Sequence, residues 1–71
     1  MNEEEEMLLK AHVESGSIVL WVPDTSTAKR VVSVRERVSE PGLCAHFSNG
    51  EHVALYNCEL SDFVVGKRLT Y

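Results

Sequence analysis

The residues of this sequence that could do chemistry lie close to one reversal of the chain. They are two cysteines and two histidines: Cys44, His46, His52 and Cys58. Thiolate and imidazole groups are ligands that Zn²⁺ and other transition metals prefer. A thiolate held beside an imidazolium is also the nucleophile of cysteine-dependent enzymes. These four residues could therefore form a metal centre or a nucleophilic centre, if their spacing fits the requirements of either site.

The spacing favours neither site. A structural zinc site usually takes cysteines in close pairs, whereas Cys58 lies too far along the chain to meet His46 easily. A cysteine nucleophile needs an orienting group and an oxyanion site in a dry pocket, which the strands of a small barrel do not offer. We therefore predict no enzyme activity, no cofactor and no metal, with Cys44, His46 and His52 as the candidate ligands if a metal is bound.

Two cysteines are also too few to build a disulfide scaffold, so free thiols are expected.

The reversal itself is a predicted β-hairpin, because apolar residues alternate on both sides of the loop 48–50. A three-residue loop with Gly50 in the left-handed conformation places Phe47 opposite Glu51. This register makes one face of the hairpin nearly all apolar, whereas a two-residue turn would mix apolar and polar rows.

The hairpin register decides which side chains share a face. Phe47 is predicted in the core. His46 and His52 are placed opposite each other on the non-core face, with β-carbons about 5 Å apart. We expect both imidazoles in solvent.

The N-terminal segment is predicted as a helix over about residues 3–13. Asn2 can cap it, four glutamates suit its first turn, and Gly16 can end it. Alternation of apolar and polar residues over 9–14 also fits a strand, but the residue types are better helix formers.

The rest of the chain is predicted as strands and turns. Strands are expected over 17–22, 29–38, 43–47, 51–56 and 62–70, with a turn over 57–61 that holds Leu60 inward. A flat sheet of this size would expose one face and two edges. We therefore predict a mainly β, five-stranded antiparallel small barrel or strongly curled sheet with a short N-terminal helix. It forms one domain over 1–71, with a helix or arm over 1–15 and the strands over 17–70.

The run from Cys44 to Val53, followed by Leu60 and preceded by a valine-rich strand over 31–38, resembles the central strands of small barrels of the Tudor and Src-homology type. The resemblance covers roughly 17–65. It implies a groove between loops that binds peptides, methylated side chains or nucleic acid. The methyl-lysine cage of such barrels does not carry over, because the five aromatic residues are scattered: Trp21, Phe47, Tyr56, Phe63 and Tyr71.

The net charge of −4 comes entirely from Glu3 to Glu6, since the remaining seven acidic residues balance seven basic ones. A strong nonspecific attraction to nucleic acid or anionic lipid is not indicated. No apolar run approaches the ~20 residues of a membrane-spanning helix, and the first residues are acidic. We expect a cytoplasmic protein that does not bind membranes.

Two kinds of binding surface remain. The first is the sheet edge or groove, where exposed aromatic and apolar residues favour contact with another protein or with a second copy in a homodimer. The second is a basic face of the strand 29–38, continued by Lys67 and Arg68, with aromatic residues for stacking. In that strand Val32, Val34 and Val38 are expected on the opposite face. The candidate binding residues are Trp21, Lys29, Arg35, Arg37 and Tyr56.

From these surfaces we predict a small non-enzymatic protein–protein interaction module, adaptor or inhibitor-like. The alternative is a nucleic-acid-binding small barrel.

Overall fold

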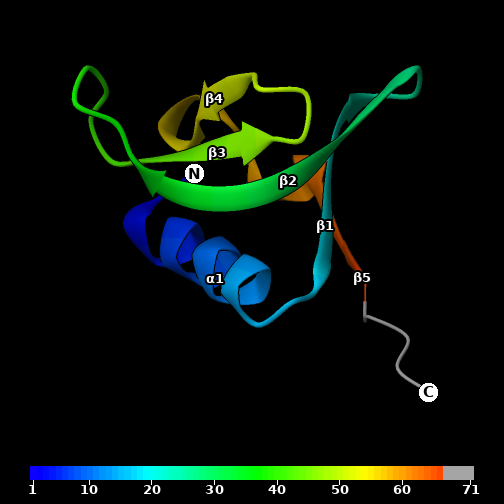
Figure 1. The fold of residues 1–71 in the computed structure, drawn as a ribbon, viewed down its shortest axis with the longest axis horizontal. Helices are drawn as coiled ribbons and strands as arrows, with labels where there is room; N and C mark the ends of the chain where they lie inside the picture. Colours follow the sequence, from blue (N-terminus) through cyan, green and yellow to red (C-terminus); the bar gives the residue numbers. More distant parts are fainter. Residues whose placement is uncertain (67–71) are drawn as a thin grey trace.

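One helix precedes five antiparallel strands that form a single sheet (Figure 1). The structure is a computed structural model that describes residues 1–66. The elements are α1 (Glu3–Glu14), β1 (Ile18–Asp24), β2 (Thr27–Glu36), β3 (Leu43–Phe47), β4 (His52–Ala54) and β5 (Phe63–Gly66), with short 3-10 turns at Leu55–Asn57 and Leu60–Asp62. The end of the predicted strand 62–70 lies outside the described residues, as do Lys67 and Arg68.

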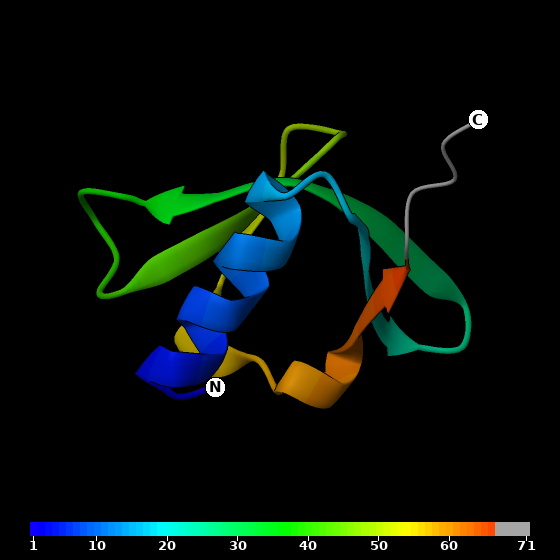
Figure 2. The same cartoon turned by 90° about the horizontal axis from the view of Figure 1, so that it is seen from below.

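The strands follow the order β4-β3-β2-β1-β5, with β2 in the centre. The helix α1 packs across one face of the curved sheet, against β2 and β1 (Figures 1 and 2). The mainly β antiparallel fold with an N-terminal helix is thus confirmed. Within residues 1–66 no ladder joins β4 to β5, so the described part of the sheet is curled but open.

The helix begins where local interactions favour it. Asn2 and Glu5 form a capping box: the Asn2 Oδ1 atom accepts from the Glu5 N–H (2.8 Å), and the Glu5 Oε1 atom accepts from the Asn2 N–H (3.0 Å). Four glutamates in the first turn complement the positive end of the helix dipole. The prediction of a helix is therefore confirmed, and the alternative of a strand is wrong.

The hairpin has the predicted register. Ala45 faces Val53, and the Phe47 N–H donates to the Glu51 carbonyl (2.8 Å). Gly50 has a φ of +91°, the left-handed conformation that the three-residue loop requires. β4 ends at Ala54, two residues before the predicted end, because the chain turns there and directs Leu55 into the core.

A β-bulge in β2 changes which residues face the core. Val31 pairs with Phe47 but Ser33 pairs with His46, so two steps along β2 match one step along β3. Val32 is the extra residue and its side chain is exposed, whereas Val31 and Val34 are buried. The prediction that Val32 and Val34 share a face is therefore wrong. Val38 lies beyond the end of β2 and is fully exposed.

The core lies between α1 and the sheet, and every described element except β4 and the turn at 60–62 contributes a buried residue to it. Its buried members are Leu9, Val19, Val31, Val34, Leu43, Ala45, Phe47, Leu55, Cys58 and Phe63. Cys44 and Cys58 are both buried free thiols, as the sequence predicts. None of the helices within residues 1–66 is long and apolar enough to cross a membrane.

Candidate functional site

The five predicted binding residues do not share one face. Lys29 lies before the bulge, two residues before Val31. It therefore lies on the same face of the sheet as Val31, the face toward the core. Arg35 lies after the bulge and pairs with Cys44, on the opposite face of the sheet. The continuous basic face expected along this strand is therefore wrong, because the extra residue at Val32 exchanges the two faces.

Trp21 and Lys29 belong to an aromatic cluster with Phe47 and Glu51. The rings of Trp21 and Phe47 stack with centroids 5.2 Å apart. The Lys29 Nζ atom lies 5.7 Å and 5.6 Å from the two ring centroids, and it donates to the Glu51 Oε1 atom at 2.9 Å. The hydrogen bond from Lys29 lowers the pKa of the Glu51 carboxyl below its usual value. Because Phe47 stacks on the Trp21 ring and the Lys29 ammonium group lies over it, Trp21 does not present a free stacking surface. The buried Nε1 atom of Trp21 has no hydrogen-bond partner within residues 1–66.

The opposite face carries the other predicted residues and the histidine pair. His46 and His52 are cross-strand partners whose ring centroids lie 5.8 Å apart. His46 is only 8% exposed, and its Nε2 atom has no hydrogen-bond partner within residues 1–66. The expectation that His46 lies in solvent is wrong, because β3 is flanked on both sides by β2 and β4. Only His52, on the edge strand, is exposed.

Arg35, Arg37 and Tyr56 are exposed, and the charges of the two arginines act on His46. The only salt bridge within the described residues joins Lys29 to Glu51, so neither arginine is paired with a carboxylate there. The Tyr56 hydroxyl lies 3.4 Å from a carboxylate oxygen of Glu40, in the loop between β2 and β3.

The charges around His46 predict a pH-dependent stability. Burial lowers the pKa of His46 below its usual value, and the positive charges of Arg35, Arg37 and His52 lower it further. In the unfolded chain the pKa of histidine is about 6.5. Below that pH the unfolded state binds a proton that the folded state does not, so the free energy of unfolding falls until His46 itself is protonated.

We expect urea midpoints to be nearly constant above pH 7 and to decrease as the pH is lowered below about 6.5, and His46→Gln to reduce this slope. His52→Gln, which removes one positive neighbour, should reduce it less. An identical slope in the wild type and in His46→Gln would contradict the assignment.

The cysteines and histidines do not assemble into a metal centre. Within residues 1–66 no group of three or more His, Cys, Asp or Glu side chains lies close enough to hold a metal ion. Burial raises the pKa of the Cys44 thiol, with a further contribution from Glu40, and burial also raises the pKa of Cys58. Both effects oppose formation of the thiolate that a metal or a nucleophilic mechanism would need.

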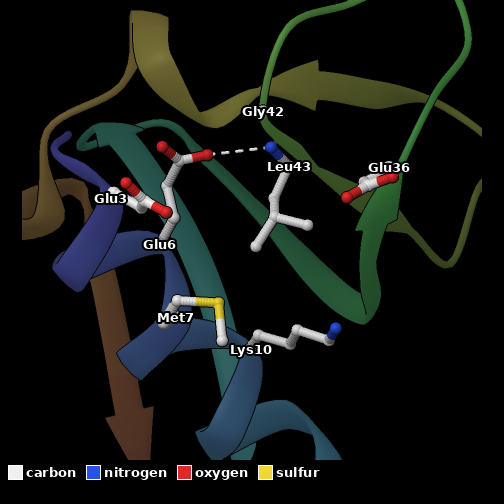
Figure 3. Close-up of a pocket in the computed structure, with 7 residues that line it drawn as sticks. All are labelled: Glu3, Glu6, Met7, Lys10, Glu36, Gly42 and Leu43. Atoms are coloured by element: carbon white, nitrogen blue, oxygen red, sulfur yellow. Dashed lines mark hydrogen bonds between the residues drawn. The ribbon is translucent and has the colours of Figure 1, made fainter.

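A pocket of about 460 Å³ opens between the first turns of α1 and the facing ends of β2 and β3 (Figure 3). Its lining residues are Glu3, Glu6, Met7, Lys10, Glu36, Gly42 and Leu43. The carboxylate of Glu6 is buried and its Oε1 atom accepts from the Leu43 N–H (2.9 Å). This bond ties the helix to the start of β3, so Glu6 has a structural role.

The outer strand β5 forms the second edge of the sheet and carries exposed apolar side chains. Its residues pair with β1 from Ile18↔Gly66 to Trp21↔Phe63. Val64 is 54% exposed and Val65 is 41% exposed, and Ile18 is 38% exposed because its cross-strand partner is a glycine. We call Ile18, Val64 and Val65 the β5 edge.

No protein-family model, curated protein sequence or solved structure matches this chain. The resemblance to Tudor and Src-homology barrels thus stays a prediction, and function has to be argued from the surfaces described above.

Sequence reasoning anticipated a sheet edge but not its residues. The signal was present, because Phe63 to Gly66 is an apolar run without charge or proline. Whether this run forms an inner strand or an edge strand depends on the strand order, and the pattern of residue types does not predict that order.

Proposed function

We propose that the chain is a non-enzymatic protein-interaction module that binds an extended strand of a protein partner along the β5 edge. The observation that carries this proposal is the exposure of Val64 and Val65 on an edge strand whose described pairing is with β1 alone. An apolar edge strand without protecting charges or proline can template the addition of a further strand.

The geometry of strand addition fits this edge. Successive residues of a strand project to opposite faces, so Val64 and Val65 lie on different sides of the sheet. A partner strand placed beside β5 would cover apolar surface on both sides. Its main chain would also pair with the outward-facing N–H and C=O groups of β5, which supplies affinity without a deep pocket.

The other surfaces support partner binding less well. In the aromatic cluster the Lys29 ammonium group lies over the Trp21 ring and is paired with Glu51. The pocket beside α1 uses its buried carboxylate to accept from Leu43. Neither surface leaves exposed apolar groups on both sides of a strand, as the β5 edge does.

A nucleic-acid-binding function is the second candidate, and one observation favours it. Arg35 and Arg37 are exposed beside the histidine pair and form no salt bridge within residues 1–66. Such arginines can bind phosphate groups. This face is smaller than the sequence predicts, because Lys29 lies on the opposite side of the sheet and Glu36 lies between the two arginines.

Substitutions on the two surfaces separate these functions. In a pull-down with this chain as bait, from an extract of the cells that naturally contain it, we expect Val64→Lys to abolish binding of the protein partner. Leu8→Lys should retain this binding. Leu8 is a matched control because it is 50% exposed but lies on α1. The pair Arg35→Glu and Arg37→Glu should leave this capture unchanged.

The opposite pattern supports the second candidate. Salt-sensitive binding to oligonucleotides that is lost in the arginine variants and kept in Val64→Lys would contradict the proposed function.

A further inference from the structure

We infer that the strand that binds the β5 edge is β5 of a second copy of this chain, paired antiparallel about a two-fold axis. This inference rests on the proposed function, since it names the partner of the same edge. It would join the sheets of two copies into one continuous sheet. Two features of the described residues point to a second copy.

The first feature is that β5 lacks the devices that protect an edge strand. Natural edges carry charged residues, proline or bulges, or they are very short. From Phe63 to Val65 the strand has none of these residues and pairs with β1 without a bulge. The other edge, β4, carries the exposed imidazole of His52 within the strand, and the chain turns away from the sheet directly after Ala54. The two edges therefore differ, and β5 is the one left able to pair.

The second feature is that β5 complements itself. A two-fold axis perpendicular to the sheet keeps the two faces of the joined sheet continuous, so residues opposite each other must point to the same face. With the axis at Val64, that side chain meets Val64 of the second copy. On the other face, Val65 then meets Phe63 of the second copy. The pairs formed by residues 63–65 are all apolar, and β-branched and aromatic cross-strand pairs are favourable. Gly66 lies opposite Asp62, the residue that precedes β5.

The mass of the full chain in solution tests this inference. Sedimentation equilibrium should give a mass that approaches twice the 8.0 kDa of one chain as the concentration is raised. Val64→Lys should weaken this self-association by about 100-fold or more, because two lysines would meet at the axis. Leu8→Lys should not change it, and circular dichroism should show that both variants remain folded.

Charge reversal tests the register itself. Val64→Lys alone and Val64→Glu alone should each be monomeric, whereas an equal mixture of the two should associate, because the lysine then meets a glutamate. Hydrogen exchange at residues 63–65 should slow as the wild-type concentration rises. Restored association in the mixture supports pairing at Val64, and its absence overturns this register.

Different experimental results would overturn self-pairing and the proposed function. A wild-type chain that stays monomeric at its highest soluble concentration overturns self-pairing. If Val64→Lys nevertheless abolishes capture of a different protein, the edge is still a binding surface and the proposed function stands. If Val64→Lys changes neither association nor capture, both are wrong.

Discussion

Replacement of Phe47 with alanine should lower the free energy of unfolding by about 3–5 kcal/mol, the largest effect that we expect from a single substitution. Phe47 is buried in the core and stacks on Trp21. Its removal leaves a cavity and deprives the Trp21 ring and the Lys29 ammonium group of a contact. Because a domain of this size has a net stability of only about 5–10 kcal/mol, much of this variant should be unfolded under mild denaturing conditions.

Trp21 is the only tryptophan of the chain, so its fluorescence reports directly on this cluster. Urea titrations followed by Trp21 fluorescence and by circular dichroism should give the same decrease in midpoint. Tyr56→Ala is the matched control, because it removes an aromatic ring that is largely exposed, and it should cost less than about 1 kcal/mol. Equal effects of the two substitutions would contradict the assignment of Phe47 to the core.

The second large effect concerns the contact between Glu6 and the turn that precedes β3. Glu6→Ala should cost about 1–3 kcal/mol, because the buried Leu43 N–H loses its acceptor. Gly42→Ala should cost a similar amount, about 1–3 kcal/mol, for two reasons. Gly42 has a φ of +72°, and a β-carbon there would lie 2.9 Å from the Glu6 Oε1 atom. The carboxylate can move away only by giving up its bond to Leu43.

These two substitutions should therefore not be additive. Once Glu6 is alanine there is no carboxylate to displace, so Gly42→Ala should then cost only its backbone strain. Gly50→Ala provides the matched control: its φ is +91°, but a β-carbon there meets nothing within 4 Å. A double-mutant cycle with urea unfolding should give a coupling of about 0.5–3 kcal/mol for Glu6 and Gly42, and none for Glu6 and Gly50. Additivity of the first pair would show that the carboxylate does not bind there.

The placement of predicted site residues shows where sequence patterns lose information. Lys29 and Arg35 lie six positions apart and should share a face of a regular strand, yet the extra residue at Val32 separates them. Val31, Val32 and Val34 have the same preference for strand structure, so the pattern of residue types cannot say which of them is left out of the ladder. The bulge is decided by how β2 fits against β3.

His46 and Glu6 show the same limit for polar residues. Alternation placed His46 on the non-core face, and that is correct. Its burial follows from the position of β3 inside the sheet order, which alternation does not encode. Glu6 reads as one of four solvated glutamates at a helix start, but the packing of α1 against the turn at Gly42 makes it an internal hydrogen-bond acceptor.

Three features follow from residues that are neighbours along the chain: the helix capped by Asn2, the loop that needs Gly50, and the hairpin register that buries Phe47. These features arise from contacts within a few positions along the chain or across one turn, so residue types and spacing suffice to predict them. Tertiary structure alone decided the bulge at Val32, the burial of His46 and Glu6, and the exposure of β5 as an edge. Each of these depends on which distant segment lies alongside, and that is set by packing over the whole chain.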